Sequence, residues 1–478
     1  MSLKQKAIKG VIWTILEAWG RRIFSYVVFF TLARILAPED FGLIALATTV
    51  ISFANIFVNQ GFTKALVQRS ELEAEHLDTA FWTNLSLGII FALITFGSST
   101  AIANIYEQPK LRSIICWLSL TFIIGAFRQV QEAVLTRKLR FKALAIRSIS
   151  VSFFGGLVGI VAAFSGLGVW SLVIQQLLGE TLGVAVLWKA SDWTPRFKFS
   201  LYHLKELFNF GINLVGISLV NFVTVNADNL LIGYFLGATA LGYYALAYKI
   251  YDLIVRLLAG TTQTIAFPIL SKKQEDTEFV RNAFYNVVEF TSILALPVCV
   301  TIILLSPQII TVFLGEEWLP ILRTMQILTL LSVYQCLFYF KQIVVISLGK
   351  PSWILYKKAL EATIDTVLFY FVVRQGIAFV ATAYAIRCLL FSPIIIIMMQ
   401  KLINLNINIY FKKCTKSLIG CFSIVCCLLI SQYYIPDSTN LKLELMISCL
   451  FSTVAYIMTM FFVAPEYFVR LKGYYRLL

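Results

Sequence analysis

The chain of 478 residues is 59% hydrophobic and only 14% charged, whereas soluble proteins average about 45–50% apolar and about 25% charged residues. This balance excludes a soluble multidomain protein, and it excludes a disordered chain because disorder needs low hydrophobicity and high charge. The net charge of +15 is spread in short clusters between apolar runs, which is typical of membrane topology determinants. We therefore expect no nucleic-acid partner.

The predicted elements are apolar runs long enough to cross a bilayer as helices. A transmembrane helix needs about 20 mainly apolar residues, and these runs are continuous and too long for the strands of a membrane barrel. No connection between them is long enough for a folded soluble domain. In chain order, the fourteen runs occupy residues 10–36, 41–67, 79–105, 111–135, 144–166, 168–188, 208–236, 240–268, 281–306, 319–348, 353–373, 376–400, 414–434 and 442–464.

Basic residues in the predicted connections set the expected orientation. The connections on one side carry 26 Lys and Arg, and those on the other side carry five. Because Lys and Arg concentrate in cytoplasmic loops, both termini are expected to be cytoplasmic. The five on the opposite side are Lys110, Arg112, Arg323, Arg374 and Lys442.

Two segments 200 residues apart are similar. Residues 36–47 read LAPEDFGLIALA and residues 236–247 read LGATALGYYALA. Each lies between an odd and an even span, and six spans separate them. The repeat predicts an all-α integral membrane protein of about 14 helices, an architecture that transporters use with substrate between the halves. The expected parts are two parallel six-helix lobes, residues 1–200 and 201–402, and two appended C-terminal helices in residues 403–478. The matching positions are Leu36, Gly42, Ala45, Leu46 and Ala47 with Leu236, Gly242, Ala245, Leu246 and Ala247.

Charged residues inside spans are candidate site residues, because a charge at the bilayer centre costs at least about 2.5–3.5 kcal/mol. The first span carries Glu17, Arg21 and Arg22. Glu17 and Arg21 stand four residues apart and can pair on one helix face, which leaves Arg22 without a local partner.

The eighth span carries Lys249, Asp252 and Arg256, and Asp252 can neutralise only one of the two cations. The first and eighth spans belong to opposite predicted lobes, so their excess cations could converge on one cavity. The functional interpretation is an anion site, in particular for phosphate, which arginine binds bidentately. The alternative is that the Arg–Glu and Arg–Asp pairs hold helices together.

The seventh span is rich in amides. Asn221 and Asn226 could supply the mixed donors and acceptors that sugar hydroxyls need. Hydrogen bonding between helices is the competing interpretation. Asp228 could equally be a proton or cation site, and with Glu17 and Asp252 it forms the candidate coupling set.

Other charges favour a structural role. Glu361 and Asp365 share a face of the eleventh span and could pair with Lys341 or Arg387. The nine cysteines show no CxxC pair and are expected to be free thiols. The two histidines lie in predicted cytoplasmic loops, and no catalytic, ATP-hydrolysing, cofactor or metal motif is present. We expect a protein that is not an enzyme.

Several stretches of the sequence resemble a known family. The stretch LARILAPEDFGLIALATTVISFANIFVNQGFTKALVQR and the pair DNLLIGYFLGATALGYYALAYKI and FPILSKKQ are similar to the polysaccharide export branch of the multidrug/oligosaccharidyl-lipid/polysaccharide (MOP) flippase superfamily. The likeness is to Wzx-type exporters of colanic and teichuronic acid and covers roughly residues 1–400. It implies a two-lobed, V-shaped, MATE/MOP-like fold of fourteen helices.

The resemblance also implies a function. A lipopolysaccharide or exopolysaccharide biosynthesis flippase would carry polyprenyl-pyrophosphate-linked oligosaccharides across a bacterial inner membrane by alternating access. Related lipid II flippases use cavity arginines on spans 1, 2 and 8; Arg21 or Arg22 and Arg256 match spans 1 and 8, whereas span 2 has only Lys64 at its inner end.

A cation-coupled multidrug-type antiporter of the same superfamily is the alternative function, and it would favour excess acids in the cavity. The expected partners are the lipid-linked substrate, membrane lipids, and a polysaccharide polymerase or export machinery.

Overall fold

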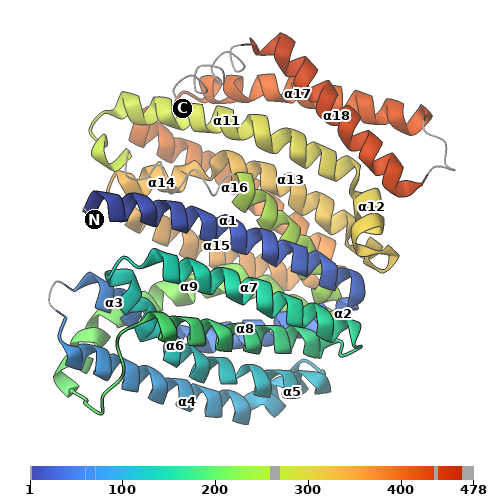
Figure 1. Cartoon of the computed structure of the whole chain (residues 1–478). Coiled ribbons are helices and arrows are strands. Elements are labelled where there is room, and N and C mark those ends of the chain that lie inside the picture. The colour runs from blue at the N-terminus through green and yellow to red at the C-terminus, as the bar shows by residue number, and fades with distance from the viewer. Residues whose placement is uncertain (1–2, 60, 70–71, 259–269, 435–439, 466–478) are drawn as a thin grey trace. The chain divides into compact units, whose positions relative to one another are not determined.

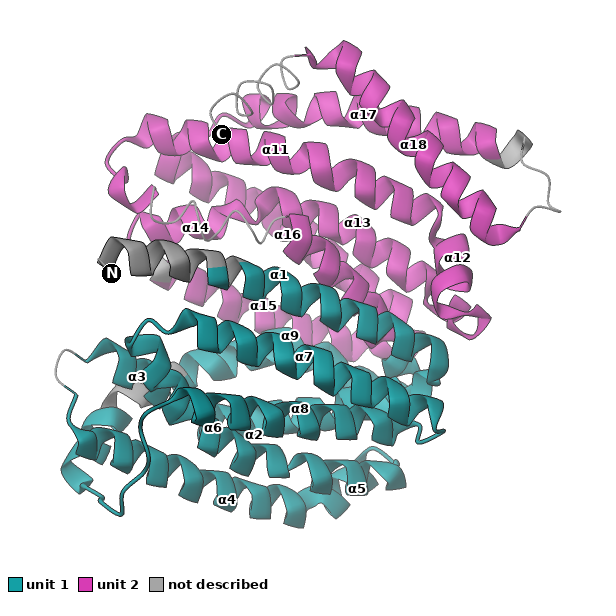
Figure 2. Ribbon diagram, in the orientation of Figure 1, with its two compact units in different colours: residues 1–242 teal, residues 243–478 magenta. Residues whose placement is uncertain are grey.

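The computed structural model describes residues 3–59, 61–69, 72–258, 270–434 and 440–465. Within these ranges every regular element is a helix (Figure 1). Contacts divide the chain into two compact units, residues 1–242 and 243–478 (Figure 2). The all-α prediction is confirmed, whereas the predicted division into two lobes and two appended helices stays a prediction.

Unit 1 contains eight helices among its described residues, together with the first part of a ninth that continues into unit 2. They are α1 (Leu3–Ile35), α2 (Pro38–Val58), α3 (Phe62–Gln68), α4 (Ala74–Ile105), α5 (Pro109–Leu118), α6 (Leu120–Arg137), α7 (Phe141–Phe164), α8 (Val169–Ala190) and α9 (Leu201–Leu258).

Unit 2 contains the end of α9, followed by α-helices and short helical turns. They are α11 (Thr277–Leu304), α12 (Ser306–Ile309), the π-helical turn η1 (Ile310–Leu314), the 3₁₀ turn η2 (Glu316–Ile321), α13 (Leu322–Phe338), α14 (Phe340–Ser347), α15 (Pro351–Val372), the 3₁₀ turn η3 (Val373–Gln375), α16 (Ile377–Ile403), α17 (Ile407–Tyr434) and α18 (Leu441–Val463).

The helices are compatible with the predicted span count. Eleven described segments are long and apolar enough to cross a membrane, and one of them, Val215–Leu258, is 44 residues long. This is about twice the length that one span needs, and it is interrupted at Gly237, where φ is 83°. The charged helices α1 and α15 fall outside the eleven. The second half of the predicted span 240–268 lies partly outside the described residues.

The two copies of the sequence repeat touch each other inside unit 1. A Cβ atom on Gly42 would overlap the backbone carbonyl of Ala238, and one on Gly242 would overlap that of Pro38. Pro38 and Ala238 are themselves 200 residues apart, as are the two glycines. The contact is therefore reciprocal, which supports the repeat that the sequence predicted.

Small residues also bring α7 and α8 together, and these two helices pack along their lengths. A Cβ on Gly155 would lie 3.1 Å from the carbonyl oxygen of Gln175 and 3.3 Å from the Cα of Gly179. Gly159 and Gly183 follow four residues after Gly155 and Gly179 on the two helices. Small residues at this spacing let membrane helices approach closely, and here they hold polar side chains of α7 beside α8.

Candidate functional site

The first group of predicted site residues lies on α1. Arg21 is exposed and Arg22 is half-buried, and neither forms an ion pair within the described part of the chain. Glu17 accepts a 2.6 Å hydrogen bond from Ser148 of α7, so the predicted Glu17–Arg21 pair is not seen. Spacing of four residues permits such a pair but does not require it, and α7 packs against α1 along its length.

A second group of charges in unit 1 was not predicted as a site. Arg128 of α6 places Nη1 3.1 Å from Glu180 of α8, and Arg147 of α7 places Nη2 3.9 Å from the same carboxylate oxygen. Glu132 lies 3.9 Å from Arg128. The Nε atoms of both arginines are buried and lack hydrogen-bond partners among the described residues. Two guanidinium groups thus face Glu180 and Glu132, and the Nε of each has no hydrogen-bond partner among the described residues.

Sequence reasoning assigned these residues to other roles. Arg147 is one of the 26 basic residues assigned to the cytoplasmic side, and the sequence singles out neither Arg128 nor Glu180. The available signal was that all three lie within predicted spans or at their ends, where a charge needs a partner.

The polar residues of the first part of α9 lie in unit 1. Asn226 donates its amide to the carbonyl of Phe222 at 3.0 Å, so one donor is used inside its own helix. Asp228 is buried, and its carboxylate accepts a 2.8 Å hydrogen bond from the Asn229 backbone. Asn221 is half-buried. The Asn226 bond lies within one helix and favours neither the sugar-binding nor the interhelical interpretation, so the roles of Asn221, Asn226 and Asp228 stay predictions.

The predicted residues of the second part of α9 lie in unit 2. Arg256 donates Nε to both carboxylate oxygens of Asp252, at 2.6 and 2.7 Å. The Arg256 side chain is 59% exposed, and Lys249 is half-buried. The expected convergence of these residues with the arginines of α1 on one cavity stays a prediction.

A buried charge cluster in unit 2 agrees with the structural interpretation. Arg387 of α16 binds both oxygens of Asp365 at 2.7 Å and one oxygen of Glu361 at 2.9 Å. Lys357 completes the cluster with a 2.6 Å bond to Glu361. The guanidinium also lies over the ring of Tyr384, 4.9 Å from its centroid. The prediction that Glu361 and Asp365 pair with a neighbouring span is confirmed, with Arg387 as the partner.

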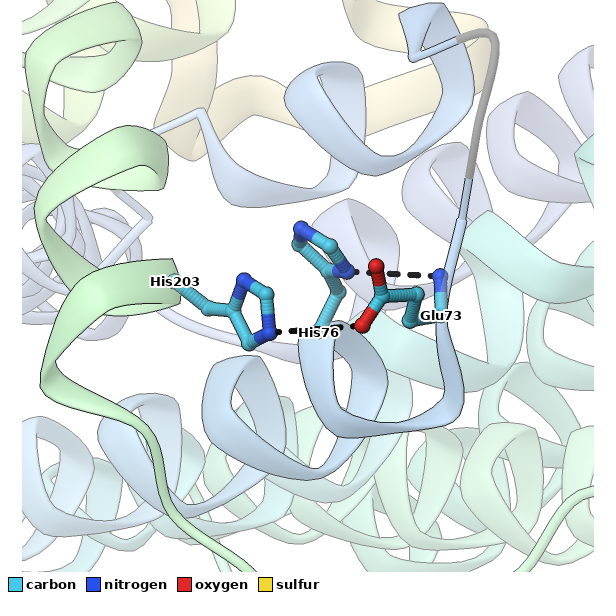
Figure 3. A group of neighbouring side chains, drawn as sticks. All are labelled: Glu73, His76 and His203. Atoms are coloured by element: carbon cyan, nitrogen blue, oxygen red, sulfur yellow. Dashed lines mark hydrogen bonds and ion pairs between the residues drawn. The ribbon is translucent and has the colours of Figure 1, made fainter.

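The remaining chemistry-bearing residues are cysteines and histidines. All nine cysteines are free thiols, as predicted. Glu73, His76 and His203 come together at one end of unit 1 (Figure 3), where one ligand atom of each lies within 4.8 Å of the others. This group could not be predicted from the sequence, because Glu73 and His76 at the start of α4 and His203 at the start of α9 follow no known motif.

Comparison with known proteins identifies a family. Residues 31–323 match the model of a family described as polysaccharide biosynthesis protein. The teichuronic acid biosynthesis protein TuaB of Bacillus subtilis is 27% identical over 420 residues, which cover 87% of this chain and 86% of TuaB. The lipopolysaccharide biosynthesis protein WzxC of Escherichia coli is 27% identical over 339 residues, covering 70% of this chain and 68% of WzxC.

Solved structures with the same fold are similar at low sequence identity. The lipid II flippase MurJ in an inward closed conformation has a TM-score of 0.78 and 15% identity, covering 96% of this chain and all of MurJ. A multidrug resistance MATE family transporter in an inward-facing conformation has a TM-score of 0.61 and 15% identity, covering 81% of this chain and 99% of its own. At this identity the likeness shows the fold alone, and it confirms the predicted MATE/MOP-like architecture.

Proposed function

The chain belongs to the polysaccharide biosynthesis protein family, and from this we propose that it carries polyprenyl-pyrophosphate-linked oligosaccharides across the membrane for cell-surface polysaccharide synthesis. A sugar-pyrophosphate headgroup cannot cross about 30 Å of hydrocarbon unaided. The protein would shield the headgroup by alternating access while the polyprenyl tail stays in lipid.

The observation that carries this proposal is the set of incompletely paired cations in unit 1. Arg21 and Arg22 form no ion pair with any described residue, and Arg128 and Arg147 both approach Glu180, with Glu132 3.9 Å from Arg128. Guanidinium groups bind phosphate oxygens through paired, charge-assisted hydrogen bonds. A pyrophosphate would use guanidinium donors that have no partner among the described residues.

Unit 2 contributes a cation in a suitable setting. Arg256 donates Nε to Asp252, and more than half of its side chain is exposed. A charged group on a membrane helix faces a wet cavity or other protein rather than lipid. The exposed Arg256 side chain would therefore meet an anionic headgroup, and Lys249 lies two turns before it. Asn221 would contact the sugars.

We place the protein in a bacterial inner membrane as a multi-pass protein with both termini cytoplasmic, as the excess of basic residues on one side predicts. A reporter fused after Leu478 that is active only in the periplasm should stay silent. Periplasmic activity would contradict this topology. Polysaccharide polymerase or export machinery would receive the flipped substrate.

Coupling to an ion gradient is proposed for Asp228, because it is the buried acid of the polar stretch of α9. Its side chain can change charge as protons or cations arrive. Transport that responds to neither a proton nor a sodium gradient would contradict this role. Glu17 stays the second coupling candidate, with its carboxylate bound to Ser148 rather than to Arg21.

The test is flipping of a lipid-pyrophosphate oligosaccharide by the purified chain in proteoliposomes, measured per molecule of folded protein. Arg22→Ala and Arg256→Ala should abolish flipping while the protein stays folded. Arg→Lys at either position should recover only part of it, since lysine keeps the charge but loses the planar fork. The contrary outcome is flipping per folded molecule that stays near the wild-type value in both alanine variants and in the double variant Asp252→Asn with Arg256→Gln. That result would show that these residues do not bind substrate.

The multidrug-type antiporter is the competing outcome. Its cationic substrates would be repelled by unpaired arginines, so the wild-type chain should neither confer drug resistance nor move a cationic dye in the same vesicles. Dye transport without oligosaccharide flipping would replace the proposed function.

A further inference from the structure

The only two histidines of the chain lie against each other at one end of unit 1. His76 is in the first turn of α4 and His203 is in the first turn of α9, 127 residues later. Their ring centroids are 3.8 Å apart and their planes meet at 38°. The residues are 3% and 8% exposed. Imidazole is the commonest metal ligand among side chains, so two adjacent histidines are a candidate metal site.

One nitrogen of each ring faces Glu206. The Nε2 atom of His76 lies 3.4 Å from Glu206 Oε2, and the Nδ1 atom of His203 lies 3.5 Å from the same oxygen. Arg69 holds that carboxylate from the other side at 2.9 Å. Since Glu206 occupies this side of both rings, a cation would be bound through the opposite nitrogen of each ring.

The other nitrogen of each ring faces Glu73, as Figure 3 shows. The Nδ1 atom of His76 accepts a long, 3.3 Å hydrogen bond from the Glu73 backbone, so this nitrogen carries a lone pair. The Nε2 atom of His203 lies 3.6 Å from Glu73 Oε2. When the ring proton of His203 is on Nδ1, the lone pair of its Nε2 atom faces the Glu73 carboxylate. A cation between them would turn repulsion into coordination.

The spacing suits a metal ion. In a tetrahedral zinc site with bonds of about 2.0–2.2 Å, neighbouring ligand atoms lie about 3.3 Å apart. The three ligand atoms already lie within 4.8 Å of one another, so small side-chain rotations would bring them into range. Two histidines and a glutamate form a known zinc ligand set that leaves one position open. Glu75, with Oε2 4.0 Å from His203 Nε2, could fill that position.

The surrounding carboxylate matches the usual outer shell of such sites. Metal-binding histidines almost always donate their second ring N–H to a carboxylate, a carbonyl or water, and Glu206 is placed to receive both. With neutral rings, the carboxylates Glu73, Glu75 and Glu206 outnumber the cations Arg69 and Lys198, which binds Glu75 at 3.1 Å. A divalent cation would offset the remaining negative charge.

We propose that Glu73, His76 and His203 bind a divalent transition metal ion, with zinc the best match to two imidazoles and a carboxylate. The ion would cross-link the first turn of α4 to the first turn of α9. It would thereby hold the connection between α8 and α9, residues 191–200, against α4. The sequence had predicted no metal site.

The test uses the full chain, purified in detergent through a tag without histidine and freed of metal by a chelator. Zn²⁺ is titrated against a chromophoric chelator, and Co²⁺ is added separately because its visible absorption reports tetrahedral coordination. The wild type should bind one ion per chain. His76→Ala and His203→Ala should each weaken binding by at least about 100-fold, since even outer-shell changes cost about 10–100-fold.

Glu73→Gln gives a variant that does not threaten the fold, because the Glu73 side chain is 67% exposed. It should weaken Zn²⁺ binding at least about 10-fold. Asp192→Asn is the matched control, because this exposed carboxylate lies outside the group and binds Lys138 and Arg140 instead; its affinity should equal that of the wild type.

The proposal is overturned if the wild type binds no Zn²⁺, if the double histidine variant still binds it, or if Glu73→Gln binds as the wild type does. Metal binding is measured without substrate, so this result is independent of oligosaccharide flipping.

Discussion

The charge clusters of the two units use the same residue types in opposite ways. In unit 2, Arg387 binds Asp365 through two bonds of 2.7 Å, and its side chain is only 6% exposed. In unit 1, Arg147 lies 3.9 Å from Glu180 and keeps a buried Nε without a partner among the described residues. A closed cluster holds helices together, whereas an open one retains donors that a ligand can use. Geometry, more than the count of charges, separates the two roles.

The largest expected effect is on the stability of unit 2. Arg387→Ala leaves Asp365 as a buried, unbalanced charge and Glu361 with Lys357 as its remaining partner; breaking a buried ion pair in this way typically costs about 3–5 kcal/mol. Folded protein should fall sharply, as measured by monodisperse yield in detergent and by the midpoint of thermal unfolding. Replacing Arg387 and Asp365 together by apolar residues of similar volume should recover much of the loss. A single variant as stable as the wild type would remove the contrast between the clusters.

The next effect is on transport through unit 1. Arg147→Gln removes an incompletely bonded guanidinium, so folding should change little. If the group binds pyrophosphate, losing a charge-assisted hydrogen bond of about 1.5–3 kcal/mol should lower flipping about 10- to 100-fold. Arg140→Gln is the control, since this exposed arginine pairs with Asp192 at 2.9 Å, outside the cluster. Equal loss of folded protein and of flipping in Arg147→Gln would make this cluster structural too.

The smallest expected effect tests whether the exposure of a charge pair, rather than the unit to which it belongs, decides how much the pair stabilises the fold. Asp252 and Arg256 are four residues apart in unit 2, but the arginine is 59% exposed. An exposed pair at this spacing contributes about 0.3–0.5 kcal/mol. Asp252→Asn should therefore leave the thermal midpoint almost unchanged, with Glu361→Gln as the buried counterpart that lowers it. A large destabilisation by Asp252→Asn would show that the pair is shielded from water.

The sequence predicted the closed cluster better than the open one. Two acids on one face of a single helix, Glu361 and Asp365, need a basic residue on an adjacent span, and few candidates exist. Glu17 had a basic residue at the right helical spacing, yet its partner is Ser148 on another helix, because spacing along one helix says nothing about what packs beside it.

The fold class was predictable because lipid imposes long apolar helices, whereas the grouping into lobes that the repeat suggests stays a prediction. The span count needed the charged helices α1 and α15, which hydropathy alone rejects. Contacts between segments far apart in the sequence could not be predicted from helical periodicity. His76 and His203 lie outside the predicted spans, where the sequence has no periodic pattern, and only the folded chain brings the first turns of α4 and α9 together there.

The reciprocal contact of Gly42 and Gly242 has a consequence for how this chain could have arisen and can change. Each glycine is required by a carbonyl that belongs to the other copy of the repeat. Such self-complementarity is that of an isologous interface in a twofold homodimer. A single ancestral half would already have carried both surfaces needed to pair with itself, and fusion would have joined an interface that existed before. It also means that the two copies cannot diverge independently here, because a side chain gained at one glycine must be accommodated by the backbone of the other copy.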